Sequence, residues 1–281
     1  MGEGACRLAV DIGGTFPDVV LWSAEGQTTA KVLTTAQAPE HGVLTAVDQV
    51  LNKTGRLLSD VSLMIHGTTL VTNALIERKG AITAFLTSDG FRDILEMGYE
   101  KRFAHYDLNA ARAAPLVPRP LRYTVPERMT ADGRVHVPLD QGAVRKVARL
   151  MSKASVEAIA VGFIHAYAYI QHEQMAAEIL QAELPGVRIC LSSDVCPEMR
   201  EYERFSTTCA NAYVQPLMAG YLDRLSNLLT HEGLHSPLYL MMSGGGLTTL
   251  DQAVRYPVRL IESGPAGGAL MSARLASARK L

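Results

Sequence analysis

Residues 8–21, LAVDIGGTFPDVVL, lie near the start of the 281-residue chain and decide the fold. Two short apolar runs flank a Gly-Gly-Thr turn, with Asp11 before the turn and Asp18 after it. Glycines allow backbone N–H groups to approach a ligand without a Cβ in the way, and carboxylate oxygens are preferred ligands of Mg²⁺. The pattern predicts a strand–turn–strand unit that binds phosphate, and the alternative is a plain hairpin with incidental acids.

Each residue of this turn has a predicted role. Gly13, Gly14 and Thr15 are expected to donate to phosphate through backbone N–H groups and the threonine hydroxyl. Asp11, at the end of the first strand, is expected to hold Mg²⁺ or its bound water, and Asp18 is a second candidate for the metal side or for a base. No lysine follows the turn and no helix begins there, so it is not the GxxxxGK[ST] phosphate loop.

The composition excludes several classes of protein. Apolar residues make up 48% of the chain and charged residues 20%, which is typical of a soluble globular protein with a core. The net charge of -1 gives no reason to expect nucleic acid or an anionic membrane as a partner, and no apolar run approaches the ~20 residues of a membrane span. The start of the chain lacks a secretion signal, and its four cysteines show no CxxC spacing. We therefore expect a cytoplasmic protein.

Short patterns along the chain predict alternating strands and helices. Three closely spaced strand-like runs, 8–12, 19–22 and 29–33, predict an antiparallel meander. Pro39 opens a helical pattern that ends near Gly55. Further strands are expected at 61–65, 82–86, 158–164, 187–191 and 237–242, and further helices at 68–78, 140–154, 171–183 and 203–231.

The fold class predicted from this alternation is α/β. Prolines exclude helix from residues 107–138, which are expected to form a long excursion with one or two extended pieces. A domain boundary is expected near 190–203, where one alternating unit has closed and a long helix begins. Residues 1–195 would form the first domain, and residues 196–281 the start of a second, because so few elements enclose little core alone.

A second polar stretch, His66-Gly67-Thr68-Thr69, follows a predicted strand and starts a helix. Thr68 or Thr69 can cap the helix, and helix N-termini attract anions. Asn73 lies four residues beyond Thr69 and therefore on a similar face of the helix. The functional interpretation is a corner that faces substrate or phosphate, with His66 as donor or acid/base. The alternative is ordinary capping beside a hydrogen-bonded core histidine.

Three other stretches carry candidate residues. Arg92 lies in a mixed-charge segment that suits a salt-bridged surface, but arginine also binds carboxylates and phosphates in a bidentate way. Two glycine-rich stretches nearer the C-terminus are candidates for close approach to a nucleotide or for tight packing. Their candidate residues are Ser243, Gly244 and Gly245 in the first stretch and Ser263, Gly264, Gly267 and Gly268 in the second.

The opening turn resembles a family signature. DIGGTFPD is similar to the D-x-G-G-T-F-T-D sequence of the hydantoinase/oxoprolinase family, a branch of the actin-like ATPase superfamily. Five more stretches resemble the same family, so the similarity covers essentially the whole chain. They are HGTTLVTNALIERKG at 66–80, GFRDILEMGYEKR at 90–102, REYERFSTTCANAYVQPLMAGYL at 200–222, MMSGGGLTTL at 241–250 and ESGPAGGA at 262–269.

The resemblance implies an actin-like, ribonuclease H-like domain with a mixed sheet and flanking helices, followed by the start of a second, truncated α/β domain. It implies ATP and Mg²⁺ as cofactors and the ATP-dependent opening of a cyclic amide such as hydantoin, N-methylhydantoin or 5-oxoproline, through phosphorylation of the ring carbonyl. Asp11, Asp18 and His66 become the candidate catalytic residues, with Thr68, Thr69, Asn73 and Arg92 at the substrate. A second, B-type hydantoinase subunit is the expected protein partner, and self-association stays open.

Two alternatives to this activity remain. The related subunit of acetone or acetophenone carboxylases also uses ATP, and the sequence does not separate ring opening from carboxylation. A remnant that acts only in assembly is the alternative from another class, because D-x-G-G-T occurs once here whereas the family carries a second such turn. The chain is therefore expected to be truncated before the second phosphate motif.

Pro17 also departs from the family, which has threonine at this position. Proline has no backbone N–H and no hydroxyl, so the turn would lose phosphate donors if this position contacts the nucleotide. The alternative is an edge position of the hairpin, where proline is tolerated.

Overall fold

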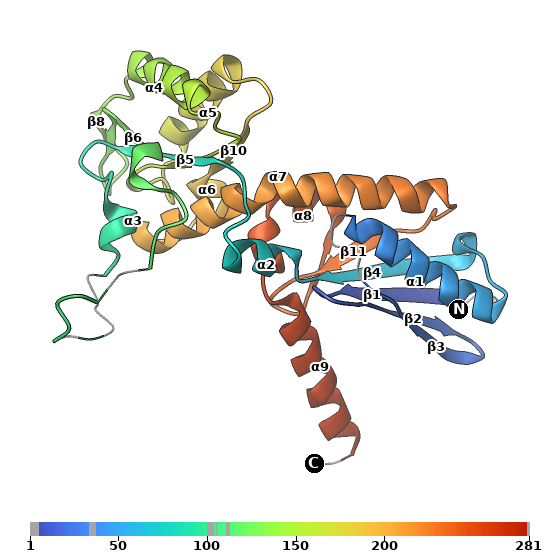
Figure 1. Cartoon of the computed structure of the whole chain (residues 1–281). Coiled ribbons are helices and arrows are strands. Elements are labelled where there is room, and N and C mark those ends of the chain that lie inside the picture. Colours follow the sequence, from blue (N-terminus) through green and yellow to red (C-terminus); the bar gives the residue numbers. More distant parts are fainter. Residues whose placement is uncertain (1–5, 34–37, 100–103, 105, 111–112, 280–281) are drawn as a thin grey trace. The chain divides into compact units, whose positions relative to one another are not determined.

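The computed structural model describes residues 6–33, 38–99, 104, 106–110 and 113–279. Its contacts divide the chain into two compact units. The first unit combines the described residues up to Lys79 with those from Leu217 onward, and the second unit is Gly80–Pro216. The division falls inside the long helix α7, Glu201–His231, at Pro216 (Figure 1).

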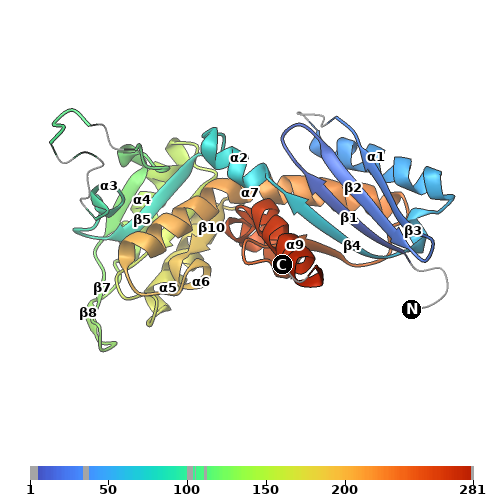
Figure 2. The same cartoon turned by 90° about the horizontal axis from the view of Figure 1, so that it is seen from below.

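The first unit is built on a six-stranded mixed sheet in the order β12-β11-β4-β1-β2-β3. Neighbours β1, β2 and β3 form an antiparallel meander, β4 and β11 run parallel to β1, and β12 is antiparallel to β11. Strands β1 to β4 lie side by side in both views (Figure 1, Figure 2). The strands are β1 Cys6–Ile12, β2 Pro17–Ser23, β3 Gly26–Lys31, β4 Val61–Thr68, β11 Leu238–Met241 and β12 Leu247–Thr249.

Helix α1, Pro39–Thr54, connects β3 to β4 and packs on β2 and β3. Pro39 is its first residue, where a missing N–H is harmless, and Gly55 ends it in the left-handed conformation with φ 65°. Its buried face includes Val43, Val47 and Val50. The other helical segments of this unit are α2 Leu70–Ile76, α8 Leu250–Arg255, α9 Ser263–Ala278 and the short turns η1 Leu58–Asp60 and η3 Pro257–Leu260.

The second unit has its own four-stranded parallel sheet in the order β10-β9-β5-β6. Every residue of β5 and β9 is buried, as expected for a parallel sheet covered on both faces. The strands are β5 Thr83–Ser88, β6 Arg122–Val125, β9 Ala158–Gly162 and β10 Arg188–Leu191, with a hairpin of β7 Arg128–Met129 and β8 Val135–Val137. The helical segments are α3 Ile94–Met97, η2 Arg119–Leu121, α4 Gln141–Lys153, α5 Gln171–Glu183 and α6 Ser192–Val195.

The predicted α/β class, with a mixed sheet and flanking helices, is confirmed. The compact units differ from a single cut at residue 195, because β11 pairs with β4 and so completes the sheet that the N-terminal strands begin. The proline-rich segment 107–138 does contain extended pieces, and one of them, β6, joins the second sheet. None of the described helices is long and apolar enough to cross a bilayer.

Candidate phosphate-binding site

The turn between β1 and β2 is closed by a hydrogen bond from the Gly13 N–H to the Phe16 carbonyl, 3.1 Å long. Gly14 and Thr15 are exposed at its tip. Asp11 lies opposite Asp18 in the antiparallel register, and directly opposed residues point to the same face. Both carboxylates are therefore on one exposed face beside the tip, as a site for phosphate and a cation requires.

The two glycines matter because they lack a Cβ, and not because of their backbone conformation. Neither Gly13 nor Gly14 is among the residues with positive φ, so the turn does not need glycine for a left-handed dihedral. A Cβ added to Gly13 would lie 3.3 Å from the Phe16 carbonyl oxygen, and one added to Gly14 would lie 3.5 Å from Asn73 Nδ2. The bare backbone at Gly14 therefore faces Asn73, which the sequence had placed at the substrate.

Gly67 seats the Asp11 carboxylate. The parallel register pairs Asp11 with Gly67, and a Cβ on Gly67 would lie 2.9 Å from Asp11 Oδ1. Partial burial, and then the charge of Asp18, raise the pKa of Asp11 above its ordinary value. Asp18 itself forms an exposed ion pair with Lys31, at 3.0 Å. A bound cation would relieve the repulsion between the two carboxylates.

The His66-Gly67-Thr68-Thr69 corner lies beside the turn. The Thr69 N–H donates to the Ile12 carbonyl at 3.1 Å, which ties the corner to the end of β1. Thr68 is buried, and its Oγ1 accepts from the Leu70 N–H at 3.2 Å. The N-cap of α2 is Thr69, whose side chain makes no capping hydrogen bond. Asn73 Nδ2 donates to Thr69 Oγ1 at 3.3 Å. The predicted juxtaposition of Thr69 and Asn73 is present.

The stretch that begins at Ser263 joins the same corner. Ser263 is buried, and its hydroxyl donates to the Thr68 carbonyl at 3.2 Å. One residue earlier, the Glu262 N–H donates to Thr72 Oγ1 at 3.2 Å. Three stretches that are far apart in the sequence therefore meet in the first unit.

The other predicted glycines of this stretch have different surroundings. A Cβ on Gly267 would lie 3.0 Å from Met241 Sδ, so this glycine allows α9 to pack on β11. Gly264 and Gly268 have open space where a Cβ would be. Their predicted contact with a nucleotide stays a prediction.

The turn at 243–246 connects β11 to β12. Gly245 has φ +79°, and a Cβ there would lie 2.7 Å from Leu270 Cδ1 on α9. The Ser243 N–H donates to the Arg259 carbonyl at 2.8 Å, while Gly244 has open space at its Cβ position. These contacts account for Gly245 as a turn and packing residue, and the cofactor role of Ser243, Gly244 and Gly245 stays a prediction.

His66 lies in the core. It is 0% exposed, and its Nε2 lies 2.8 Å from the hydroxyl of Tyr221, a residue of α7. Burial lowers the pKa of His66 to about 4, so the ring is neutral at pH 7. This arrangement favours the alternative of a hydrogen-bonded core histidine, and an acid/base role for His66 stays a prediction.

Arg92 belongs to the second unit. Its Nη2 donates to the Arg119 carbonyl at 3.1 Å, and Arg119 in turn forms a two-bond ion pair with Asp93 at 2.8 and 3.0 Å. These contacts fit the salt-bridged surface that the sequence also allowed. The last three residues of the family-like stretch 90–102 lie outside the described residues.

Pro17 is buried and starts β2 opposite Ile12. Its carbonyl accepts from the Val32 N–H at 3.3 Å. This bond marks 17 and 32 as a hydrogen-bonded pair of the antiparallel ladder, and the two residues of such a pair exchange both bonds. An N–H at position 17 would therefore have pointed to residue 32 rather than to the turn. The structure therefore favours the interpretation of Pro17 as a strand-end residue.

Sequence reasoning missed Gly67, Thr72 and Tyr221. Gly67 had a signal, because a glycine at the end of a buried strand often marks a close approach. Tyr221 and Thr72 had none, because their partners His66 and Glu262 are 155 and 190 residues away in the sequence.

Comparisons with known proteins show the family of the chain. A family model described as the hydantoinase/oxoprolinase N-terminal region matches residues 7–184, and one described as hydantoinase/oxoprolinase matches residues 204–281. The chain therefore belongs to the hydantoinase/oxoprolinase family. It is 35% identical over 270 residues to an uncharacterized protein of Methanocaldococcus jannaschii, covering 94% of this chain and 39% of that protein. It is 34% identical over 275 residues to caprolactamase subunit alpha of Pseudomonas jessenii, covering 95% of this chain and 39% of that subunit.

Two solved structures share the fold. The ATP-dependent caprolactamase from Pseudomonas jessenii matches with a TM-score of 0.88 at 33% identity, over 96% of this chain and 40% of that one. The nucleotide-free structure of acetone carboxylase, an ATP-dependent enzyme, matches with a TM-score of 0.89 at 25% identity, over 98% of this chain and 41% of that one. The chain thus spans about two fifths of the length of these relatives.

Proposed function

We propose that this chain supplies the nucleotide-binding part of an enzyme that opens a cyclic amide with ATP. The observation that carries the proposal is the meeting of three stretches in the first unit: the Gly14–Thr15 tip, the corner at Thr69 and Asn73, and Ser263. The similarity to a caprolactamase subunit, which is named for a cyclic amide, supports the substrate class.

The residues of the site fit a nucleotide with its metal ion. The exposed turn offers the bare backbone of Gly14 and the hydroxyl of Thr15 as donors to phosphate. Asp11 lies against Gly67, and its pKa is raised by partial burial and then by the charge of Asp18; it would hold Mg²⁺. The hydrogen bond from Asn73 to Thr69 Oγ1 holds Asn73 beside the turn. ATP, when bound, supplies the phosphoryl group that makes the oxygen of the amide carbonyl a good leaving group.

The relatives' names suggest the rest of the assembly. Caprolactamase is named with an alpha subunit, so a second, B-type subunit that takes part in hydrolysis is the proposed partner of this chain. The complex is proposed to be cytoplasmic.

Calorimetric titration of the chain with Mg·ATP tests the proposal. We expect saturable binding by the wild type and at least a tenfold weaker dissociation constant for Asp11→Asn, because a metal–carboxylate contact is lost. Asp223→Asn, which removes an exposed carboxylate on α7, is the matched control and should bind like the wild type. No binding by any of the three would argue for the remnant that acts only in assembly, and equal affinity of all three would show that the nucleotide binds elsewhere than at Asp11.

A second candidate is the ATP-using subunit of a ketone carboxylase. The match to acetone carboxylase, at a TM-score of 0.89 and 25% identity, supports it, beside the caprolactamase match at 0.88 and 33% identity. ATP consumption by the complete complex separates the two activities. Consumption that depends on a ketone and bicarbonate indicates carboxylation, and consumption that depends on a cyclic amide and water alone indicates ring opening.

A further inference from the structure

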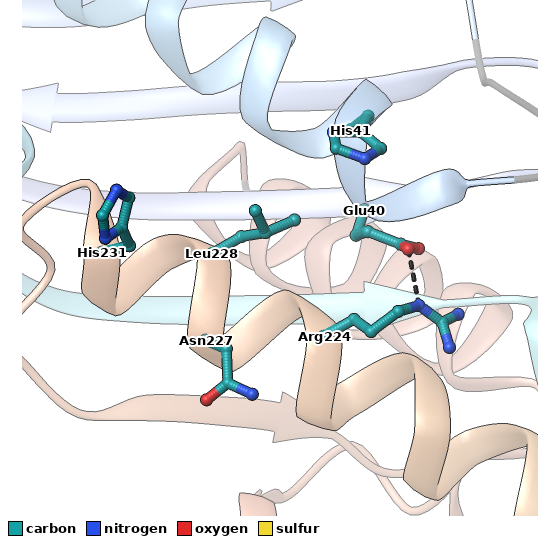
Figure 3. A pocket seen from close by; sticks show the side chains of 6 residues that line it. All are labelled: Glu40, His41, Arg224, Asn227, Leu228 and His231. Atoms are coloured by element: carbon teal, nitrogen blue, oxygen red, sulfur yellow. Dashed lines mark hydrogen bonds and ion pairs between the residues drawn. The ribbon is translucent and has the colours of Figure 1, made fainter.

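A groove lies between the start of α1 and the last two turns of α7, within the first unit (Figure 3). Its volume is about 480 Å³, within the roughly 300–1,000 Å³ of small-molecule sites. It shares no lining residue with the candidate phosphate-binding site. The lining residues are Glu40 and His41 from α1 and Arg224, Asn227, Leu228 and His231 from α7.

Spacing explains why four residues of α7 line one groove. Positions 224, 227, 228 and 231 follow the i, i+3, i+4, i+7 rule and therefore form one stripe of the helix. In Figure 3 the side chain of Leu228 lies between His231 and the Glu40–Arg224 pair, and His41 projects from α1 above that pair. The stripe is polar apart from Leu228, so it is no core face that awaits burial.

Glu40 holds Arg224 in a defined orientation. Arg224 Nε donates to Glu40 Oε1 at 2.6 Å, with the Glu40 side chain 4% exposed and the Arg224 side chain 56% exposed. Burial acts to raise the pKa of Glu40, but the hydrogen bonds from Arg224 and from the backbone outweigh it and hold the pKa below its ordinary value. Glu40 is therefore ionised at neutral pH, and its bond to Arg224 uses Nε rather than the Nη groups of the guanidinium.

The groove is lined by a buried acceptor without a partner and by exposed hydrogen-bond donors. Within the part of the chain that the structure describes, the buried Oε2 of Glu40 has no hydrogen-bond partner. Leaving a buried carboxylate oxygen unpaired is costly, and a donor in the groove would remove that cost. Arg224 and Asn227 also line the groove, and the Nη groups of the one and the amide of the other are donors that suit a carboxylate. The same groove thus offers a carboxylate oxygen of Glu40 that suits a cation, and donors of Arg224 and Asn227 that suit an anion.

We propose that this groove binds an amino acid, a molecule that carries an ammonium and a carboxylate group. The ammonium donates to Glu40 Oε2, the carboxylate accepts from Arg224 Nη1 and Nη2 and from Asn227, and the aliphatic part contacts Leu228. Because the Arg224 side chain, which contacts Glu40, is 56% exposed, a small shift of Arg224 admits the ammonium group.

The proposed function gives this ligand class a source, and only this link rests on it. Hydrolysis of a cyclic amide breaks the bond between the carbonyl carbon and nitrogen. Water adds its oxygen to the carbon and its protons to the nitrogen, so that one molecule carries a carboxylate and an ammonium group. The groove would therefore sense the product of the reaction at a place separate from the phosphate turn.

The test is titration calorimetry of the chain without nucleotide. The probes are L-glutamate and 6-aminohexanoate, which differ in the spacing of their two charges, with hexanoate, hexylamine and inorganic phosphate as comparisons. We expect one of the two amino acids to bind at least tenfold more tightly than hexanoate, hexylamine or phosphate, because two charge-assisted contacts replace one. Equal binding of hexanoate or phosphate, or no binding of either amino acid, would overturn the proposal.

Substitutions in the groove assign the binding to it. Arg224→Gln should weaken amino-acid binding at least tenfold, while Arg149→Gln on the exposed face of α4 should leave it unchanged. Because Arg224→Gln leaves Glu40 unpaired and can unfold the unit, Asn227→Ala is the second variant. It keeps the ion pair and should still weaken binding several-fold. Wild-type affinity in a folded Asn227→Ala and Arg224→Gln would place the ligand elsewhere and overturn the proposal.

Titration of the same variants with Mg·ATP separates the two proposals. Groove variants should bind nucleotide like the wild type, since the groove shares no residue with the phosphate turn. If the wild-type chain binds an amino acid but not Mg·ATP, the proposed function is wrong and the groove remains an amino-acid site. If the chain binds Mg·ATP but no amino acid, the groove proposal is wrong and the proposed function stands.

Discussion

Strand β1 of the first unit and strand β5 of the second both end in polar residues, with opposite surroundings. At the end of β1, Asp11 is exposed and the next turn presents Gly14 and Thr15 at the surface. At the end of β5, Ser88 is fully buried, donates to Glu127, and accepts from the Ile164 N–H at 3.2 Å. Polar groups at the end of β1 are exposed to solvent, whereas those at the end of β5 are hydrogen-bonded to other protein groups.

Two buried carboxylates of the second unit, those of Glu127 and Glu173, lie in closed hydrogen-bond networks. Glu127 also lies 2.8 Å from Nδ1 of His172, so both of its oxygens are bonded. Glu173 is fully buried and accepts from two backbone N–H groups and two serine hydroxyls at 2.6 to 3.0 Å. Burial raises the pKa of Glu173 although these hydrogen bonds oppose it. Such satisfied groups stabilise the loops after the strands.

The difference teaches how to separate a binding site from a structural cluster in this chain. A network whose donors and acceptors are all paired has nothing left to offer a ligand. The turn after β1 keeps backbone and side-chain groups at the surface, and two carboxylates on one face there repel each other until a cation arrives. Substitutions in the closed networks should therefore affect folding, and those at the open turn should affect binding.

The largest expected effect is on folding of the second unit. Arg204 is 0% exposed, and its guanidinium donates to Ser192 Oγ and to the carbonyls of Glu198 and Phe163 at 2.9 to 3.1 Å. Arg204→Ala should lower the free energy of unfolding by about 3–5 kcal/mol, because it leaves buried acceptors unpaired and a cavity behind. Urea unfolding followed by circular dichroism measures it, with exposed Arg149→Ala as the control. A loss below about 1 kcal/mol would show that the network is not structural.

A pH-dependent loss of stability is the next effect in size. The pKa of His66 is about 4 when folded and about 6.5 when unfolded, so below pH 6.5 the unfolded state binds more protons. Stability should therefore fall as the pH drops from 6.5 to 4, by about 3 kcal/mol in total, and this part should level off below pH 4.

The variant His66→Gln isolates this contribution. Its stability should fall less steeply with acid than that of the wild type, whereas His136→Gln, at an exposed position, should follow the wild-type profile. Unfolding in urea at several pH values gives both curves. Parallel curves for the wild type and His66→Gln would mean that His66 is not buried as a neutral ring.

The smallest expected effect concerns nucleotide affinity at the exposed turn after β1. Gly67→Ala places a Cβ 2.9 Å from Asp11 Oδ1 and should displace that carboxylate. Mg·ATP affinity should fall about tenfold, equal to about 1.4 kcal/mol, with little change in the free energy of unfolding. Gly142→Ala is a matched control, since its Cβ would lie 3.2 Å from an oxygen of Asp140 in the second unit. A Gly67→Ala protein that binds nucleotide normally would detach Asp11 from the site.

Local features followed from the sequence alone. Pro39 and Gly55 marked the ends of α1, and the apolar runs around the Gly-Gly-Thr turn indicated the β1–β2 hairpin, because turns, caps and periodicity depend on neighbouring residues. The family followed from the motifs, and the α/β class from the alternation of elements. These are short-range properties that any window of the sequence contains.

The tertiary structure alone decided which of these features meet. Ser263 contacts Thr68 across 195 residues, and His66 is buried against Tyr221 across 155, because β11 pairs beside β4 and draws the C-terminal stretch into the first unit. The Glu40–Arg224 pair spans 184 residues in the same way. Strand pairing and burial depend on the whole chain, so no local pattern could distinguish the exposed carboxylate of Asp11 from the buried ring of His66.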